Sequence, residues 1–184
     1  MTQAPTLTTA RLTLRHHTLD DFDAYADLWA TDDAKYMGGP LIREYAWGAF
    51  CSDVAHWQLH GFGAWAVDCG DDTIGQVALG LLPNFPEREL GWLIYPQFRG
   101  QGYATEAACA ARDYALKTLR WDTLVSYIDP DNTASINVAT RLGATLDTDA
   151  KSPEPQDLVY RHSLNTASLQ PKYSHQISTK EQAI

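Results

Sequence analysis

The feature that most restricts the fold is a long helical stripe made largely of alanine, which follows a short loop containing two glycines. Between residues 102 and 119 the apolar side chains recur at helical spacing, at Ala104, Ala107, Ala108, Ala111, Ala115 and Leu119. Side chains this small allow a helix to lie very close to a flat neighbour. The sequence therefore predicts a helix packed tightly on a β-sheet, which is an α/β (α+β) arrangement.

The segments on either side of this helix supply the strands of that sheet. Runs typical of strands lie before it at residues 10–16, 62–68, 73–82 and 87–95, and after it at 123–128, 144–148 and 157–163. The turns at 69–72 and 83–86 are too short for parallel crossovers, so they favour an antiparallel meander.

Helical spacing predicts three further helices. The first opens with Thr18 and Asp21, three residues apart as in a capping box, and stops near the breaker at 38–40. The second follows that breaker and carries an apolar stripe from Trp47 to Val54. The third is short and covers residues 133–142.

Length and composition fit one domain with a loose end. The chain has 184 residues, of which 45% are hydrophobic and 20% are charged, so it can bury a core. We expect residues 1–164 to form this domain and the polar residues 165–184 to be a disordered tail. No apolar run approaches the roughly 20 residues that cross a bilayer, and we see no export signal.

The cysteines indicate the cellular compartment, and the net charge limits the classes of binding partner. Cys51, Cys69 and Cys109 form no CxxC pair, so we expect free thiols in a reducing compartment and a cytoplasmic protein. The net charge of −9 argues against nucleic acid or an anionic membrane as a partner, because both require concentrated positive charge. It is compatible with a cationic partner such as a protonated amine.

The loop that precedes the alanine helix has the physical properties of a phosphate site. It joins a strand to a helix N-terminus, where unpaired backbone N–H groups and a partial positive charge attract anions. Gly100 and Gly102 let a phosphate approach the main chain closely. There is no GxxxxGK[ST] motif, and Thr105 stands where a dinucleotide fingerprint requires glycine. Two glycines alone also fit a loop that merely turns the chain.

The residue pattern of the whole loop indicates a family more specifically than its two glycines do. Gln97-x-x-Gly100-x-Gly102 resembles the (Gln/Arg)-x-x-Gly-x-(Gly/Ala) signature of the GNAT superfamily, the general N-acetyltransferases. Residues 99–106 resemble the RimJ/RimL-like branch of that superfamily. The same branch is resembled, in the right order, by residues 10–15, 89–93, 131–135 and 141–143, and the resemblance covers roughly residues 10–164.

This resemblance carries expectations for fold and activity. It implies a mixed, mostly antiparallel sheet of about six or seven strands flanked by about four helices. The fourth and fifth strands, 87–95 and 123–128, would run parallel and splay apart around the pantetheine arm of a cofactor. The implied reaction moves an acetyl group from acetyl-CoA to a primary amine, by direct attack in a ternary complex and without a metal. The amine would belong to a small molecule or a protein N-terminus.

The resemblance also assigns cofactor-binding residues. Backbone groups of Leu93, Ile94 and Tyr95 are expected to pair with the pantetheine amides. The diphosphate is expected on the amides of Arg99, Gly100, Gln101, Gly102, Tyr103 and Ala104, with Thr105 beside them. Asn132 suits a helix N-cap and, in the family, also bonds the cofactor. Arg141 has a helix-dipole explanation and is not assigned.

The chemistry requires a base, because most amines are protonated at pH 7 and must lose a proton before attack. Glu89 is the candidate, and a solvated carboxylate paired with Arg88 is the alternative. A backbone N–H of Leu93 or Ile94 would stabilise the oxygen that gains charge.

The acid that protonates the leaving sulfur is less defined. Many family members have a tyrosine seven residues after the motif asparagine, where this chain has Ala139. Ser135 could serve as the acid, and so could Tyr95 or Tyr127, and the sequence does not choose among them. For Ser135, helix capping and a bond to the cofactor are equal alternatives. The departure at Ala139 leaves a second hypothesis, an acyl-CoA-binding regulatory module with little or no turnover.

The acceptor pocket is expected between residues 31 and 62, with Tyr36, Met37 and Trp47. His56 and His60 have the spacing of metal ligands, but without a third ligand in register a surface helix is the better interpretation. The sequence is compatible with a monomer or a homodimer.

Overall fold

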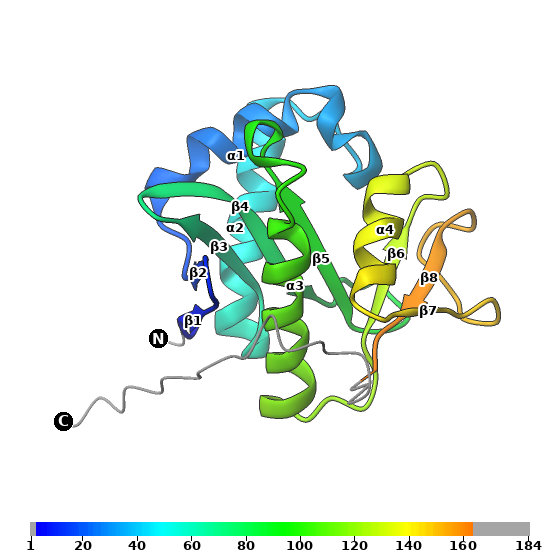
Figure 1. The fold of residues 1–184 in the computed structure, drawn as a ribbon. Helices are drawn as coiled ribbons and strands as arrows, with labels where there is room; N and C mark the ends of the chain where they lie inside the picture. The colour runs from blue at the N-terminus through cyan, green and yellow to red at the C-terminus, as the bar shows by residue number, and fades with distance from the viewer. Residues whose placement is uncertain (1–2, 164–184) are drawn as a thin grey trace.

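A mixed sheet forms the centre of the protein (Figure 1). The structure, a computed structural model, describes residues 3–163. The strands lie in the order β1-β2-β3-β4-β5-β6-β8-β7. Their bounds are Leu7–Thr8 (β1), Thr13–Arg15 (β2), Ala64–Cys69 (β3), Asp72–Gly80 (β4), Glu89–Ile94 (β5), Val125–Ile128 (β6), Thr145–Leu146 (β7) and Leu158–Arg161 (β8).

Every neighbouring pair of strands is antiparallel except β5 and β6, which run parallel. The predicted α/β class and the mostly antiparallel sheet are confirmed, with eight strands in place of six or seven. The additional strand is β1, whose two residues are too few to show an alternating pattern. The predicted tail, residues 165–184, lies outside the described residues.

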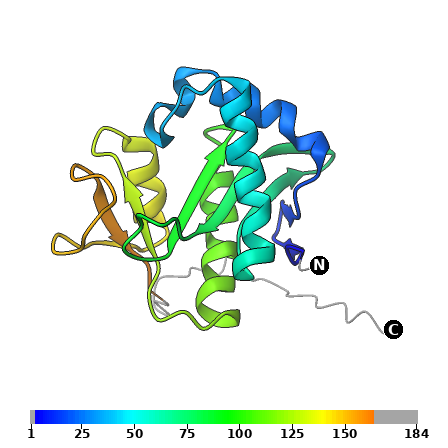
Figure 2. The same ribbon diagram turned by 180° about the vertical axis from the view of Figure 1, so that it is seen from behind.

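Helices cover both faces of the sheet. Their bounds are Phe22–Trp29 (α1), Arg43–His60 (α2), Tyr103–Asp113 (α3) and Thr133–Arg141 (α4). A π-helical turn continues α3, and a 3₁₀ segment, Asp32–Met37 (η2), lies between α1 and α2. In Figure 1, α3 and α4 lie in front of the sheet, and Figure 2 shows α2 on the opposite face with α1 against it. Within residues 3–163, no helix is long and apolar enough to cross a membrane.

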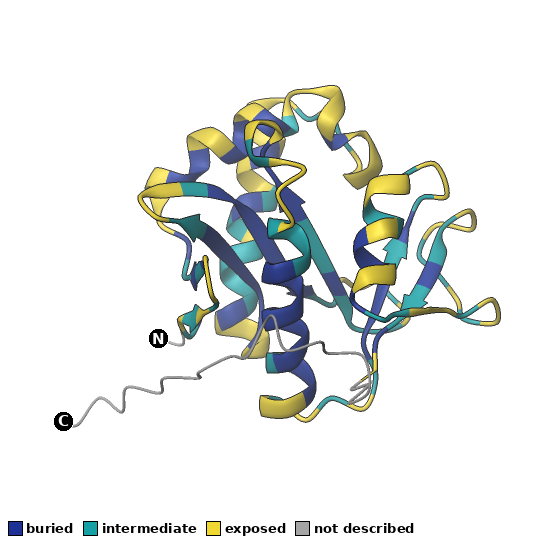
Figure 3. Cartoon of the chain, in the orientation of Figure 1, coloured by how far each residue is buried: buried dark blue, intermediate teal, exposed yellow. Residues whose placement is uncertain are grey.

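The alanine stripe packs α3 onto the middle of the sheet. Ala107, Ala108 and Ala111 are at most 1% exposed, and α3 packs on β4 and β5. Figure 3 shows the buried side of α3 over the buried central strands. Because β5 leads directly into the loop before α3, this close packing holds the helix N-terminus beside the end of β5.

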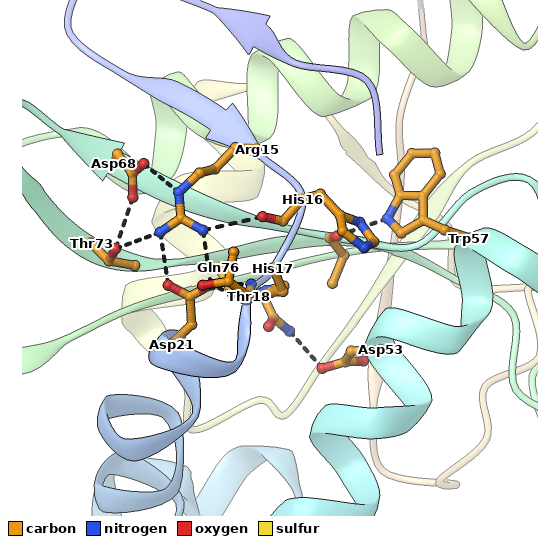
Figure 4. A network of polar contacts seen from close by, with 11 residues as sticks. Arg15, His16, His17, Thr18, Asp21, Asp53, Trp57, Asp68, Thr73 and Gln76 are labelled. Atoms are coloured by element: carbon orange, nitrogen blue, oxygen red, sulfur yellow. Dashed lines mark hydrogen bonds and ion pairs between the residues drawn. The ribbon is translucent and has the colours of Figure 1, made fainter. Parts of the chain in front are cut away.

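A polar network fixes the N-terminal segment on the sheet (Figure 4). Arg15 donates to Asp21 (2.7 and 2.8 Å), Asp68 (2.6 Å) and Thr73 (2.9 Å). The Asp21 carboxylate also accepts the Thr18 N–H (2.8 Å), as the predicted capping box requires. Burial opposes ionisation of Asp21, but the hydrogen bonds from Arg15 and Thr18 hold its pKa well below the usual range.

Candidate functional site

The two parallel strands share one pair of facing residues before they separate. Glu89 of β5 faces Val125 of β6, and the Val125 N–H donates to the carbonyl of Arg88 (3.0 Å). In a continued parallel ladder, the next bond would join the Tyr127 N–H to the Leu90 carbonyl.

Side chains replace that bond. Ser126 Oγ donates to the Leu90 carbonyl (2.5 Å), and the Tyr127 N–H is close enough to the Glu89 carboxylate to act against the rise in its pKa. Since the Ser126 hydroxyl hydrogen is used, its oxygen accepts from Nε2 of buried His162 (2.9 Å). Burial lowers the pKa of His162 to about 3, so this imidazole is neutral. Beyond these contacts β5 and β6 diverge (Figure 1), which confirms the predicted splay.

Two cavities adjoin where the strands diverge. The first, about 480 Å³, is lined by η2, the end of β5, the start of α3 and α4, and we call it the α3 cavity. The second, about 590 Å³, is lined by η2, β4, β5, β6 and the loop before β8, and we call it the acidic cavity. Residues that line both are Lys35, Tyr36, Met37, Trp92, Leu93, Asn132 and Ser135.

The glycine loop presents its main chain to the α3 cavity. Gly100 and Gly102 have φ angles of +77° and +81°, which other residues adopt only with strain. A Cβ built at Gly100 would meet nothing within 4 Å. The N–H groups from Gly100 to Thr105 donate to no other group within residues 3–163, as expected for a helix start. The loop is therefore a set of free donors at the positive end of a helix, which suits a phosphate.

The structure places most of the predicted loop residues at this cavity. Arg99, Gly100, Gly102, Tyr103, Ala104 and Thr105 line it. Gln101 does not, because it is exposed and its carbonyl accepts a hydrogen bond from Arg11 (3.0 Å). The Arg99 side chain donates to the Ile94 carbonyl (3.0 Å) and pairs with Asp33, which links the loop to β5 and to η2.

The backbone groups that β5 exposes along its edge are not all the ones that were predicted. The backbone of Leu90 faces β6, so by alternation the groups of Trp92 and Ile94 face the gap. The Leu93 carbonyl lies against β4, only 2.1 Å from where a Cβ of Gly75 would stand. Leu93 and Ile94 both line the α3 cavity, but only the backbone of Ile94 is directed to it.

Tyr95 does not take part in the cavity. Its N–H donates to the carbonyl of Ile74 and its own carbonyl accepts from Phe98, both at 2.9 Å. Its ring is 4% exposed, and it lines neither cavity. The structure gives no support to the prediction that Tyr95 pairs with a pantetheine arm, because its N–H is already bonded to β4 and Tyr95 lines neither cavity. The same burial removes Tyr95 as a candidate acid.

The start of α4 supplies polar side chains at the junction of the cavities. Asn132 caps the helix, since its Oδ1 accepts the Ser135 N–H (3.1 Å), and both residues line both cavities. Arg141, left unassigned from sequence, also lines the α3 cavity. Ala139 is fully buried and lines neither cavity, so the nearby hydroxyl is that of Ser135.

Glu89 lies in the acidic cavity with an unusual proton affinity. Burial, together with the charges of Asp157 and Asp53, raises its pKa to about 7, although the Tyr127 N–H acts in the opposite direction. Arg88 does not pair with Glu89, because its guanidinium stacks on Trp121 at 4.7 Å from the ring centroid. The alternative of a solvated Glu89–Arg88 pair is thus excluded.

Further carboxylates surround Glu89. Asp129, Glu154 and Asp157 line the same cavity, and burial together with the first two raises the pKa of Asp157. No ion pair within residues 3–163 includes any of these carboxylates or Glu89. Gln76, which also lines the cavity, donates to half-buried Asp53 (2.8 Å), as Figure 4 shows. Lys35 is the one basic residue of the lining, so the four carboxylates outnumber it and the balance of charge favours a cation.

The predicted acceptor residues are only partly brought together. Tyr36 and Met37 of η2 line both cavities, and the Tyr36 hydroxyl donates to the carbonyl of Asp131 (3.3 Å) across the junction. Trp47 lines neither cavity, because its ring packs edge-on against Phe22 with centroids 4.8 Å apart. The prediction for Trp47 is not supported.

Sequence reasoning missed the carboxylates that line the acidic cavity. Asp129 directly follows β6 and Asp157 directly precedes β8, so both stand at strand ends near the splay. The sequence could show that each of them stands at the end of a strand. It could not show that they lie close together, because that depends on β8 lying beside β6. Groups of three or more side chains able to hold a metal are absent from residues 3–163.

Comparison with known proteins agrees with this geometry. The acetyltransferase (GNAT) domain family matches residues 11–145. An acetyltransferase structure from Agrobacterium tumefaciens is 48% identical, with a TM-score of 0.83 over 87% of this chain and 95% of its own. RimJ of Mycobacterium smegmatis, solved in complex with CoA-disulfide, has a similar fold, with 16% identity and a TM-score of 0.69 over 90% of each chain. YnaD of Bacillus subtilis, named an uncharacterised N-acetyltransferase, is 25% identical over 138 residues, 74% of this chain and 81% of its own length.

Proposed function

The chain belongs to the GNAT acetyltransferase family, and we propose that this acetyl-CoA-dependent enzyme acetylates a positively charged primary amine. The observation that carries the proposal is the junction of two unlike cavities at the splay. One presents free backbone donors at a helix N-terminus, and the other holds Glu89 among further carboxylates, which outnumber the one basic lining residue, Lys35.

Acetyl-CoA fits the α3 cavity by the chemistry of its lining. The free N–H groups from Gly100 to Thr105 would hold the diphosphate, with Gln101 contributing main chain only. The backbone of Trp92 and the N–H of Ile94 would pair with the pantetheine arm as an added strand. The Asn132 side chain retains two N–H donors while its oxygen caps α4. Acetyl-CoA supplies an activated acyl carbon when bound.

Glu89 would act as the base. A carboxylate with a pKa of about 7 is partly ionised at neutral pH and is still basic enough to take a proton from an ammonium group, directly or through water. The neutral amine attacks the acyl carbon and forms the new C–N bond, the thioester C–S bond breaks, and a backbone N–H at this edge of β5 that the pantetheine arm leaves free would stabilise the acyl oxygen.

Ser135 is the proposed source of the proton for the departing sulfur, and its oxygen would then take up the proton that the nitrogen loses once the C–N bond has formed. Its hydroxyl lines both cavities, so it can reach a group at their junction. No cysteine lines either cavity, which supports direct attack within a ternary complex over an acetyl-cysteine route. Tyr127 lines the acidic cavity, but its hydroxyl accepts the Glu87 N–H (3.0 Å), so we rank it second.

The carboxylates Asp129, Glu154 and Asp157 support a cationic acceptor. These carboxylates repel each other, none of them forms an ion pair within residues 3–163, and Lys35 is the one basic residue of the lining, so a protonated amine would relieve the repulsion on binding. We further propose that residues 1–164 form the catalytic domain of a cytoplasmic protein. The three cysteines, all free thiols, fit that compartment.

The test is release of free CoA thiol from acetyl-CoA with a panel of amines, combined with the mass gain of one acetyl group on the amine. We expect turnover with diamines and with amines that carry a second positive charge, and loss of turnover in Glu89→Gln with acetyl-CoA affinity retained. Binding of acetyl-CoA without thiol release on any amine would instead support an acyl-CoA-binding module, the hypothesis that Ala139 left open.

A further inference from the structure

Arg11 connects the N-terminal segment to the glycine loop through several contacts. Its guanidinium contacts the Glu106 carboxylate through Nε and Nη2, each at 2.7 Å. Nη1 donates to the Gln101 carbonyl (3.0 Å), and the guanidinium lies 4.5 Å from the centroid of the Tyr103 ring. One side chain from before β2 thus contacts the loop, the first residue of α3 and the first turn of that helix.

The negative charge of Glu106 explains why these contacts of Arg11 matter for an anion site. Its carboxylate is fully buried, and it lies in the first turn of the helix whose free N–H groups face the α3 cavity. A carboxylate there occupies the positive end of the helix and would repel a bound diphosphate. Arg11 supplies the opposing charge, while the Arg11 N–H (3.0 Å) and Thr9 Oγ1 (2.6 Å) donate to the other carboxylate oxygen.

The contact with Gln101 acts on the orientation of the loop. The Gln101 carbonyl and the Gly102 N–H belong to one planar trans peptide unit, so they point in opposite directions. By holding this carbonyl on the α3 and β2 side, Arg11 fixes the direction of the Gly102 N–H. Gly102 has a φ of +81° and lines the α3 cavity, so this N–H is among the free donors.

We propose that Arg11 is a positioning residue for the diphosphate site: it neutralises Glu106 and locks the Gln101–Gly102 peptide so that the loop accepts an anion. Arg11 lines neither cavity, so it acts through the loop and not on the cofactor directly. This inference rests on the proposed binding of acetyl-CoA at the loop. It is separate from the identity of the acceptor and from the role of Glu89.

The experiment compares two acetyl donors that differ in the diphosphate. Acetyl-CoA carries it, whereas S-acetylpantetheine has the same thioester and arm without it. In Arg11→Ala we expect the KM for acetyl-CoA to rise about tenfold or more, as loss of a charge-assisted hydrogen bond implies, with kcat little changed. The KM for S-acetylpantetheine should change less than about twofold. Equal changes for both donors, or none, would overturn the proposal.

Further variants separate charge from general damage. Glu106→Gln should reduce the penalty of Arg11→Ala, because the repelling carboxylate is gone, and the double-mutant cycle measures this coupling. If Arg11→Ala does not fold, Arg11→Lys provides the same donor comparison, with a smaller selective loss for acetyl-CoA because lysine keeps the charge but not the fork. An additive cycle, or an Arg11→Lys effect equal on both donors, would contradict the mechanism.

An arginine at the start of α2 provides a control. Arg43 also pairs with a carboxylate, that of Asp23, and lies over an aromatic ring, Phe22, at 4.7 Å. It lines neither cavity, so Arg43→Ala should leave the ratio of the two donor KM values unchanged. Calorimetry with CoA keeps the test independent of turnover. If the wild-type protein binds CoA but acetylates nothing, the affinity loss in Arg11→Ala still decides the inference.

Discussion

The two cavities at the splay are built from different materials. The α3 cavity depends on main chain, on a loop whose glycines have positive φ and on N–H groups left free by the start of a helix. The acidic cavity depends on side chains brought by β4, β5, β6 and the loop before β8. A main-chain site is local in sequence and suits a cosubstrate shared by many enzymes. A side-chain site can change residue by residue and suits an acceptor that differs among them.

The largest effect should come from the acidic cavity. We expect Glu89→Gln to lower kcat by about 100-fold or more, because the variant keeps the shape of the side chain but cannot accept a proton. Affinity for acetyl-CoA should change less than about twofold, since Glu89 does not line the α3 cavity. Steady-state thiol release and calorimetry measure the two quantities. A parallel loss of acetyl-CoA affinity would show that the two cavities are not independent.

The main-chain cavity should respond to backbone strain. Gly100→Ala forces a side chain into φ +77° and should cost about 1–2 kcal/mol of folding stability. As the loop relaxes, its N–H groups turn away, so we expect the Kd for acetyl-CoA to rise about tenfold. Gly61 is the control, because it has φ +74°, an equally open Cβ position and no place in either cavity. Gly61→Ala should lose similar stability without any change in Kd, and a shared loss of affinity would contradict the assignment.

The acidic cavity should also give the enzyme its pH dependence. Because the pKa of Glu89 is raised to about 7, the base is protonated below that pH, and activity increases as pH rises through it. With amine at saturation, kcat at pH 6 should be about a tenth of its plateau. The residual activity of Glu89→Gln should lack this step between about pH 5.5 and 8.5. A wild-type profile that is flat over the same range would remove Glu89 from the base role.

A smaller effect should follow from removing one carboxylate near Glu89. We expect Asp157→Asn to raise the KM for a cationic amine about threefold, an effect that shrinks as salt is added. The KM for acetyl-CoA should stay constant. Asp71 lies on the exposed turn between β3 and β4 and lines neither cavity, so Asp71→Asn controls for the loss of charge alone. An equal effect in both variants would mean that the net charge, and not the cavity, attracts the acceptor.

The same contrast explains how far the sequence could be read. The loop and helix of the α3 cavity are contiguous, so the family signature in the sequence was enough to predict that Gly100, Gly102 and most of their neighbours lie together, and they line this cavity. The alanine stripe and the capping box at Thr18 were equally local, and the structure confirms both.

Sequence reasoning fell short where the answer depends on distant partners. Tyr95 was assigned to the pantetheine arm, but its N–H is already bonded to Ile74 and it lines neither cavity. Trp47 was assigned to the acceptor pocket because it lies in the right segment, yet it packs on Phe22. The carboxylates around Glu89 were missed because β8 joins the sheet beside β6, and no spacing in the chain reveals that neighbour.

The hydroxyl–imidazole pair that ends the β5–β6 ladder has a consequence for measurement. With a pKa of about 3, His162 keeps one protonation state at every pH at which an enzyme of this kind is assayed, so Ser126 holds Leu90 in the same way throughout. The contact between Ser126 and His162 therefore does not change with pH in that range, whereas the nearby Glu89 carboxylate gains or loses its proton. A step in the rate near pH 7 would then come from the proton on Glu89 and not from a change in the contact between Ser126 and His162.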